Sequence, residues 1–267
     1  MPQMTPEVCI KVTMLVALAG VLLDSLEILS VYDIYRDPCI FGWPLKSSLF
    51  KWWIPGTDTV LRYLYSYPVS RWLLWFDIVA CVLIWLAYNH FYYLVIALAA
   101  IRILWTIRNG LPGSEAADHM LNLVLVCCCA FIILHGTSSR YLILYFIAAQ
   151  AVLAYFTAGT VKLLRRRWRE GDALRYILST SLFRNSTFVS VLSSNPAVEK
   201  ALCRAVILFE VLCPLLVFIN VKSCLVFLLL GVLFHASIAI VQGLNLFPFA
   251  FISTYPAILF TSVQIHR

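Results

Sequence analysis

The stretch YLILYFIAAQAVLAYFTAGTVKLLRRRWREG, residues 141–171, carries no charged side chain until Lys162 and then runs into a block of arginines. Its uncharged part, Tyr141–Val161, is long enough to cross a bilayer, because a membrane-spanning helix needs about 17–25 mostly apolar residues. The stretch therefore predicts a membrane helix with a single lysine at its mouth, followed by arginines, Trp168 and a Glu-Gly turn.

The rest of the chain has a similar composition. Of its 267 residues, 62% are hydrophobic and 12% are charged, and the mean hydropathy is +0.90. The hydrophobic content is higher, and the charged content lower, than in an ordinary globular domain, and no long segment alternates with the period of two that a membrane barrel requires. We therefore expect an all-α, polytopic membrane helix bundle of eight spans. The expected spans are Val8–Ser30, Trp72–Tyr88, Phe91–Ile107, Met120–His135, Tyr141–Val161, Ala201–Asn220, Cys224–Val241 and Leu246–Val263.

Residues 1–267 are expected to form one transmembrane domain with three parts. The first span, residues 8–30, is interpreted as a membrane helix, not as a cleaved signal peptide, because its apolar run continues past the Ala17-Leu18-Ala19 site. Residues 32–71 are rich in aromatic residues and should lie at the headgroup level. Residues 72–263 should form the core bundle. It is interrupted by a short amphipathic helix near Gly171–Leu182 and a Ser/Asn-rich turn through Asn195-Pro196.

Lysines and arginines are distributed unevenly between the two ends of the expected spans. Sixteen of the 20, with Arg102 and Arg108 among them, fall at the connections after the first, third and fifth spans. Because positive residues near span ends stay cytoplasmic, both termini of this multi-pass membrane protein are expected outside. The net charge of +7 is then explained by topology and attraction to anionic lipid, not by a nucleic-acid partner.

The sequence contains no metal-binding, phosphate-binding or hydrolase motif. The nine cysteines include no C-x-x-C spacing and lie mostly in or beside spans, where they are expected to pack as small apolar residues. The five histidines lack the spacing that would place two ligands on one helix face. We therefore expect no metal site.

Lys162 is the first candidate for chemistry. It follows Ala158 and Gly159 by four and three residues, so the same helix face offers small residues where a neighbouring helix or an isoprenoid headgroup could approach. Burial would lower the pKa of the lysine, and a neutral amine could act as a general base. The alternative is a snorkelling lysine that heads an arginine cluster and has no chemical role.

His119 is the second candidate, at the expected start of a helix with Asp118 beside it and Asn122 one turn on. The positive end of the helix dipole would keep this imidazole neutral, so that it could exchange a proton near pH 7. The alternative is that Asp118 only caps the helix.

His235 and Glu210 are polar residues inside otherwise apolar spans, which makes each a functional hypothesis. His235 shares a helix face with Gly231, Ala239 and Gln242, and an interhelical hydrogen bond without chemistry is the alternative. Glu210 is expected to pair with a cation, with His235 or with a protonated partner, in either a structural or a functional role.

Three segments resemble a known family. Tyr155-Phe156-Thr157-Ala158-Gly159, followed by Lys162, Trp168 and Glu170-Gly171, resembles the membrane domain of the vitamin K-dependent gamma-carboxylase, called the HTTM domain in bacteria. The helix start at Asp118-His119 and the Phe234-His235 pair with Phe247 downstream resemble two further segments of that family in the same order. The resemblance covers the chain from about Phe50 onwards.

The resemblance implies quinol-linked chemistry. Lys162 matches the lysine base that deprotonates a reduced quinone (a vitamin K hydroquinone-like cofactor), O2 then generates a strong base, and CO2 is taken up in the carboxylase. His119 and His235 match further catalytic positions, and the three side chains are expected to converge on one cavity with Trp168 near its rim. Residues expected to bind the substrate are Trp168, Asp118, Asn122, Glu210, Gln242 and Tyr155.

The chain departs from the carboxylase in ways that affect the expected function. The Asn-rich segment before the histidine is Glu115-Ala116-Ala117-Asp118 here, Val161 replaces one of two lysines, and the propeptide-binding domain is expected to be absent. The first interpretation, which follows from the resemblance, is an HTTM-type enzyme of a bacterial inner membrane acting on a lipid-soluble quinol or isoprenoid compound. The second, typical of the SdpB-like branch, is a non-catalytic factor for maturation, export or immunity of a secreted antimicrobial peptide, with a peptide precursor or accessory protein as partner. A solute carrier is less favoured, because duplicated halves are not visible.

Overall fold

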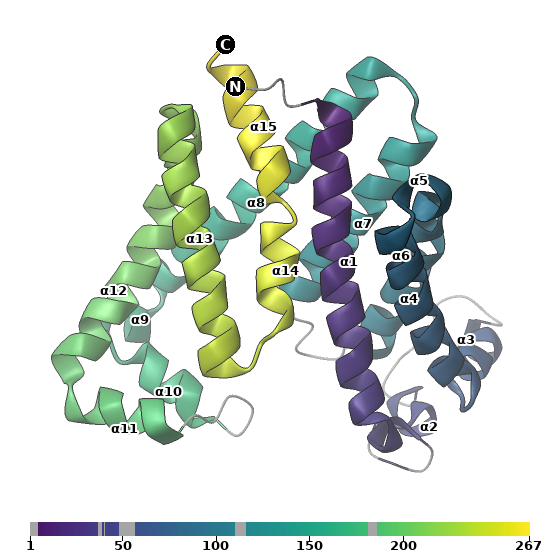
Figure 1. The fold of residues 1–267 in the computed structure, drawn as a ribbon. Helices are drawn as coiled ribbons and strands as arrows, with labels where there is room; N and C mark the ends of the chain where they lie inside the picture. Colours follow the sequence, from purple (N-terminus) through teal and green to yellow (C-terminus); the bar gives the residue numbers. More distant parts are fainter. Residues whose placement is uncertain (1–4, 37–38, 40, 48–56, 110–115, 181–185) are drawn as a thin grey trace. The chain divides into compact units, whose positions relative to one another are not determined.

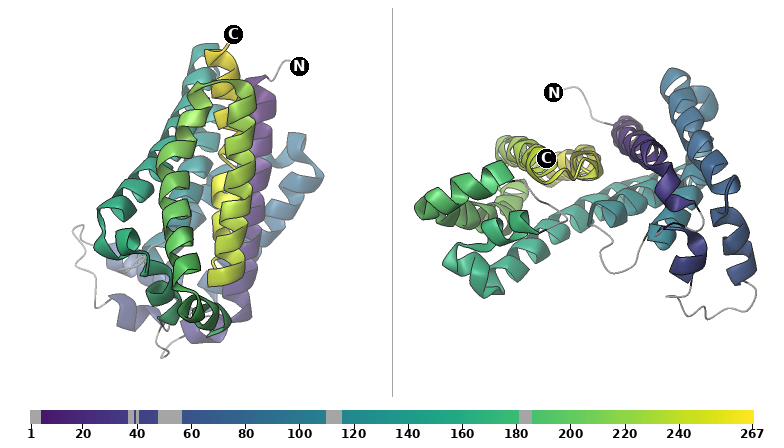
Figure 2. Two further views of the ribbon diagram at one scale, coloured as in Figure 1. Left: turned by 90° about the vertical axis from the view of Figure 1, so that its left-hand side faces the viewer. Right: turned by 90° about the horizontal axis from the view of Figure 1, so that it is seen from below.

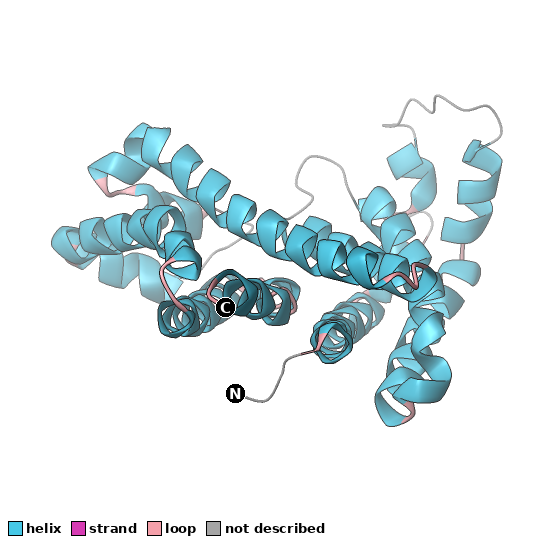
Figure 3. Ribbon diagram, turned by 90° about the horizontal axis from the view of Figure 1, so that it is seen from above, coloured by secondary structure: helices cyan, strands magenta, loops and turns pink. Residues whose placement is uncertain are grey.

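The computed structural model describes residues 5–36, 39, 41–47, 57–109, 116–180 and 186–267. Within these ranges the chain forms helices and no strand (Figure 3). Eight segments in the described chain are long and apolar enough to cross a membrane, which confirms the expected all-α membrane bundle. They are Pro6–Ser30, Val69–Leu86, Tyr88–Arg108, Ala116–Ile133, Thr137–Leu164, Pro196–Phe218, Val221–Gln242 and Leu246–Ile265. Of the residues named above, Phe50 and Glu115 lie outside the described ranges.

The chain divides into two compact units. The C-terminal unit consists of residues 1–13 and 134–267, and the N-terminal unit consists of residues 14–133. The first helix, α1 (Pro6–Ser30), is continuous and contributes to both. Each unit is described by itself.

The N-terminal unit contains most of α1 and the next eight elements along the chain (Figure 1). These are η1 (Tyr32–Tyr35), α2 (Trp43–Ser47), α3 (Thr57–Tyr65), α4 (Val69–Leu86), α5 (Tyr88–Phe91), η2 (Tyr92–Leu94), α6 (Val95–Asn109) and α7 (Ala116–Ile133). Its core is a cluster of apolar and aromatic side chains from α1, η1, α4 and α6: Ile28, Tyr32, Leu74, Ile101 and Trp105.

Arg102 and Arg108, which the sequence placed among the loop cations, are instead buried on α6. Arg102 is 2% exposed and Arg108 is 0% exposed. The Arg108 guanidinium donates to the backbone oxygens of Tyr65 at 2.9 Å and Tyr35 at 3.0 Å. Both arginines therefore act as internal partners in this unit and carry no weight for orientation, which stays a prediction.

The aromatic segment between α1 and α4 is only partly a surface belt. Tyr63 is 67% exposed, as a headgroup-level side chain would be, but Trp43 and Tyr65 are 1% and 3% exposed. The rings of Trp43 and Tyr65 pack with their centroids 4.4 Å apart. The expectation of a uniform interfacial belt is therefore wrong for these two residues, because each ring buries more apolar area against the other than it would at the interface.

The C-terminal unit is organised around α8 (Thr137–Leu164), the longest helix of the chain. It continues through α9 (Arg166–Glu170), α10 (Ala173–Ser179), α11 (Ser186–Ser194), α12 (Pro196–Leu212), η3 (Cys213–Phe218), α13 (Val221–Gln242), α14 (Leu246–Ile252) and α15 (Tyr255–Ile265). Helix α8 packs on α12 and α15, and α13 packs on α14 and α15, which run beside it in Figure 2. At the start of α8, Arg140 donates to Glu7 of α1 at 2.6 Å.

The last span is interrupted between Pro248 and Pro256. Helix α14 ends at Ile252 and α15 begins at Tyr255. The two residues between them, Ser253 and Thr254, donate their hydroxyls to the oxygens of Ala250 and Phe251 at 2.8 and 2.6 Å. Side chains thus satisfy carbonyls that the interrupted helix leaves free, as an interruption inside a membrane span requires.

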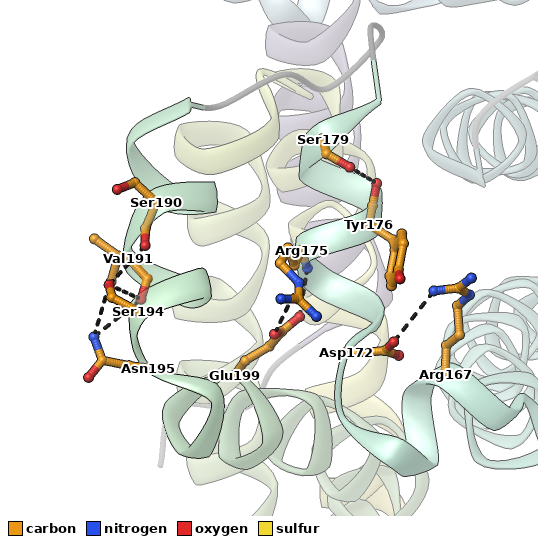
Figure 4. Close-up of polar contacts among 10 residues, drawn as sticks. All are labelled: Arg167, Asp172, Arg175, Tyr176, Ser179, Ser190, Val191, Ser194, Asn195 and Glu199. Atoms are coloured by element: carbon orange, nitrogen blue, oxygen red, sulfur yellow. Dashed lines mark hydrogen bonds and ion pairs between the residues drawn. The ribbon is translucent and has the colours of Figure 1, made fainter.

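The connection between α8 and α12 contains more helix than the sequence predicted. The expected amphipathic helix is present as α10, but the Ser/Asn-rich segment that we expected to be a turn forms α11. In α11, the Ser194 hydroxyl donates to the Ser190 oxygen at 2.9 Å (Figure 4). Such bonding one turn back along the helix lets a serine sit in a helix at little cost. The expected turn is confined to Asn195, which precedes α12.

Candidate functional site

One face of α8 positions the candidate lysine. Tyr155, Gly159 and Lys162 are spaced by four and three residues, so they share the helix face that packs on α12. A β-carbon at Gly159 would lie 2.8 Å from the Glu210 β-carbon. No larger residue fits, and the glycine therefore brings the two helices close enough for Lys162 to reach α12.

Lys162 and Glu210 form an ion pair between α8 and α12. The Lys162 Nζ donates to the two carboxylate oxygens of Glu210 at 2.6 and 2.5 Å. The side chains are 23% and 5% exposed, respectively. The expected pairing of Glu210 with a cation is confirmed. The lysine is not a lone snorkelling side chain, because its ammonium is held inside the unit by a carboxylate.

Trp168 completes the surroundings of Lys162. Helix α8 ends at Leu164, and Arg165 adopts an extended conformation (φ −81°, ψ 127°) before α9 begins. This break places the Trp168 ring with its centroid 5.4 Å from the Lys162 Nζ, within the range of a cation–π contact. Because α8 ends at Leu164, Arg165 and Arg166 do not lie on the helix face that carries Lys162. An uninterrupted helix would have placed them on that face.

A pocket of about 430 Å³ lies beside this helix end. It is lined by Arg165, Arg166, Arg167, Trp168, Ala173, Tyr176 and Ile177. Trp168 therefore belongs both to the pocket and to the surroundings of Lys162, and its expected position at the rim of a cavity shared by His119, Lys162 and His235 stays a prediction.

The pocket arginines are fixed by neighbouring side chains. The Arg167 guanidinium stacks 3.6 Å from the Tyr176 ring centroid and lies 3.4 Å from Asp172 (Figure 4), and Arg166 pairs with Glu170 at 2.6 Å. Hydrogen bonding to Glu170 raises the pKa of Arg166, and hydrogen bonding to Tyr176 raises the pKa of Arg167. The pocket therefore keeps its positive charge over the physiological pH range.

A second polar cluster lies further along α8. His235 of α13 is 2% exposed, and its Nε2 is 2.7 Å from the Tyr155 hydroxyl. That hydroxyl is also 3.0 Å from the Tyr255 hydroxyl on α15. The His235 Nδ1 has no hydrogen-bond partner in the described structure. His235 therefore makes an interhelical hydrogen bond through Nε2, while its Nδ1 has no partner among the described residues.

Packing holds this cluster tightly. The His235 ring stacks on Phe251 with centroids 4.3 Å apart and planes 14° apart, and Phe247 lies 6.2 Å away. A β-carbon at Gly231 would collide with the Tyr255 hydroxyl. The small residue that the sequence placed on the His235 face therefore makes room for Tyr255. Sequence reasoning missed Tyr255 altogether.

The two clusters form one polar track through the C-terminal unit. Tyr155 and Lys162 are two helical turns apart, about 10 Å along the axis of α8. The charge of Lys162 acts on His235, and the charge of Glu210 acts on Tyr155. Four helices, α8, α12, α13 and α15, each contribute to this track.

The remaining candidates belong elsewhere. His119, Asp118 and Asn122 lie on α7 of the N-terminal unit, so their convergence with Lys162 and His235 stays a prediction. Asp118 pairs with Arg102 at 3.0 Å, and Asn122 donates to the Thr106 hydroxyl at 2.7 Å.

Gln242 is the last residue of α13, and its expected role in binding the substrate also stays a prediction. No three metal-ligating side chains meet in the parts of the chain described here. All nine cysteines are free thiols.

Comparison with known proteins identifies the half of the chain that holds this track. The family model for the HTTM domain matches residues 132–264, and the match begins two residues before the C-terminal unit resumes at Leu134. It contains Lys162, Glu210 and His235 but not His119. No curated protein and no solved structure matches the chain. Over residues 132–264, this membrane protein is therefore similar to the HTTM domain family.

Proposed function

We propose that this protein is an HTTM-type membrane enzyme that removes a proton from a lipid-soluble hydroxyl compound, with Lys162 and Glu210 as the proton-accepting pair. The observation that carries the proposal is the contact of the Lys162 Nζ with both Glu210 oxygens at the end of a membrane span. A charged pair inside a membrane bundle is expensive to maintain and is a functional hypothesis by default.

The Lys162–Glu210 pair has two forms, which differ in the position of one proton. One form is the ammonium with the carboxylate, and the other is the neutral amine with the carboxylic acid, related by transfer of one proton along the 2.5 Å contact. We assign the reaction to the second form: the neutral amine of Lys162 takes the substrate proton, which leaves a lysine ammonium, a glutamic acid and a substrate oxyanion. The ammonium then stabilises the oxyanion electrostatically. The base expected at Lys162 is therefore better described as the pair.

The surroundings favour an aromatic, lipid-soluble substrate. Lys162 lies between apolar spans and the Trp168 ring, and the neighbouring pocket combines that ring with Tyr176 and three arginines. A reduced quinone fits this chemistry, since its phenolic hydroxyl is about as acidic as a lysine ammonium, so that a neutral amine can deprotonate it, and its ring can stack on Trp168. When bound, it would supply the electrons for a reaction with oxygen.

The second cluster supports the same proposal. Tyr155 connects two hydroxyl or imidazole groups, His235 and Tyr255, two turns along the helix from Lys162. A neutral imidazole with one free nitrogen can accept a proton or a hydrogen bond. We assign His235 and Tyr155 the role of positioning the substrate and holding protons beside the Lys162–Glu210 pair.

The test uses the full chain in lipid nanodiscs with a reduced naphthoquinone carrying an isoprenoid tail. We expect oxygen uptake and an oxidised quinone product detectable by mass spectrometry. Lys162→Arg retains a cation that can pair with Glu210 but cannot release its proton. Glu210→Gln removes the acid. Each should lower turnover by about 10²–10⁴-fold, the usual contribution of a general base. Lys200→Arg, an exposed lysine of the same unit, is the matched control.

Two outcomes would count against the proposal. Wild-type turnover by folded Lys162→Arg protein would show that the lysine is not part of the base. Absence of any quinol-dependent oxygen uptake by the wild-type protein would remove the quinol substrate. In that case, survival of cells that make a secreted peptide, compared with and without this protein, would test the non-catalytic maturation or immunity function.

A further inference from the structure

The N-terminal unit contains a buried acid that the proposed function does not use. Asp77 lies in the middle of α4 and is 0% exposed. Neither of its carboxyl oxygens has a hydrogen-bond partner among the described residues. The Ser25 hydroxyl lies near the carboxyl but is not in hydrogen-bond geometry with it. An acid in this position, at the level of the membrane core, requires an explanation.

The groups around Asp77 form a charge network with too few cations. Arg102 of α6 interacts electrostatically with Asp77, as does Asp24 of α1. The two terminal nitrogens of the Arg102 guanidinium already have partners: Nη1 donates to Asp24, and Nη2 donates to Asp118 of α7 at 3.0 Å. Cys81, one turn along α4, is the remaining titratable neighbour. One guanidinium therefore faces three carboxyl groups.

This imbalance decides the state of Asp77. A carboxylate that is fully buried without a cation or a donor is strongly destabilised in an apolar medium, and protonation removes the charge. Asp24 and Asp118 avoid that fate, since they hold the guanidinium and are 21% and 26% exposed. Asp77 has neither advantage.

We propose that Asp77 is a proton-binding site within the membrane bundle. It holds its proton at neutral pH as long as Asp24 and Asp118 occupy the two ends of the Arg102 guanidinium. When either of them leaves, a guanidinium nitrogen becomes available, Asp77 gives up its proton and pairs with Arg102. The partly exposed Asp24 and Asp118 connect this exchange to the surface of the unit.

This site is independent of the proposed function. The network belongs to the N-terminal unit, outside residues 132–264; its members are Asp24, Asp77, Arg102 and Asp118. The Lys162–Glu210 pair could therefore be inactive without affecting the Asp77 proton, and the reverse also holds.

Infrared spectroscopy tests the proposal directly. A protonated carboxyl group has a C=O stretch that a carboxylate lacks and that shifts in D2O. We expect this band in the full chain in nanodiscs at neutral pH, and we expect Asp77→Asn to remove part of it. Asp33→Asn, which changes a 92% exposed acid, should leave the band unchanged. An identical band in the wild-type and Asp77→Asn proteins would show that Asp77 is ionised and would overturn the proposal.

A second variant tests the competition for Arg102. In Asp118→Asn, one guanidinium nitrogen is free to pair with Asp77, so the band should titrate at least one pH unit lower than in the wild-type protein. No shift would refute the coupling to Arg102. If Asp77→Asn does not fold, ¹³C-labelling of the aspartate carboxyl groups in the wild-type protein gives the same answer, because the label separates aspartate from Glu210. A wild-type spectrum without an aspartic acid band would then overturn the site.

Discussion

Gly159 packs so closely on Val211 that a β-carbon at position 159 would lie 2.9 Å from the Val211 backbone nitrogen. The contact brings α8 within reach of the backbone of α12 at the residue that follows Glu210. The ion pair between Lys162 and Glu210 therefore depends on a residue that has no side chain. Helix spacing and site geometry are set by the same position.

The first prediction concerns this close approach. Gly159→Ala should lower the free energy of unfolding by about 1–3 kcal/mol, because overpacking forces a backbone shift. In a helix without such a contact, the same change is normally stabilising. Gly136→Ala is the control, since the nearest atom there is the flexible Ser139 hydroxyl at 3.3 Å, and it should cost less than Gly159→Ala. Equal thermal midpoints for the two variants in nanodiscs would contradict the prediction.

The second prediction concerns the energetic coupling of Lys162 and Glu210. Removing one partner of a fully buried ion pair costs about 3–5 kcal/mol, because the other charge is left unpaired. Lys162 is 23% exposed, so we expect a smaller cost of about 1–3 kcal/mol for Lys162→Met or Glu210→Leu alone. The double variant should be less destabilised than the sum of the two. A double-mutant cycle of unfolding measures this coupling, and strict additivity would exclude it.

The third prediction compares the two tyrosines of the second cluster. Tyr155→Phe removes the hydroxyl that contacts both His235 and Tyr255, leaving two buried polar groups unsatisfied. Its cost should be about 1–3 kcal/mol. Tyr255→Phe breaks only one of these contacts and should cost less. Thermal unfolding of the two variants checks the order, and a larger loss for Tyr255→Phe would show that the cluster is held together differently.

The fourth prediction concerns the arginine-lined pocket. Arg167→Gln should reduce the retention of phosphatidylglycerol during purification, because the pocket loses a charged donor that is already fixed against Tyr176. Phosphatidylcholine retention should not change, and the effect should weaken at high salt. Arg204→Gln alters an exposed arginine on α12 outside the pocket and serves as the control. Native mass spectrometry measures the bound lipid. Equal loss from both variants would indicate only a nonspecific effect of charge.

The fifth prediction concerns orientation. The charge distribution places the connection between α8 and α12 in the cytoplasm. A cysteine introduced at Ser190 should then resist a membrane-impermeant reagent in intact cells. A cysteine at Ser138, at the other end of α8, should react. The reverse pattern would invert the topology.

The number and type of the spans could be predicted because they depend only on local composition. A run of apolar residues long enough to cross a bilayer is visible in the sequence whatever it packs against. Lys162 was recognised for a similar reason, since a charge at the end of such a run is conspicuous. The break at Arg165 was not predictable from this information, and it changed which neighbours the lysine has.

The pairing of charges depends on residues that are distant in the sequence. Arg102 contacts Asp24 and Asp118, which are 78 and 16 residues away, and no periodic pattern announces such a contact. Arg102 lies inside the expected span Phe91–Ile107, yet its positive charge led us to count it among the loop cations, which was wrong. Tyr255 was missed because a tyrosine in a membrane span is common. Asp77 offered a signal that could have been used: a carboxyl group inside an apolar run.

The division of α1 between the two units has a practical consequence for dissecting this protein. Residues 1–13 belong with residues 134–267, and Glu7 is joined to Arg140 on α8. A fragment that starts at Leu134 would therefore lack part of its own packing, although it contains almost the whole family match. Co-expression of the amino-terminal helix as a separate peptide should restore what truncation removes. The first helix contributes to both units, so a fragment of the C-terminal unit should be expressed together with residues 1–13.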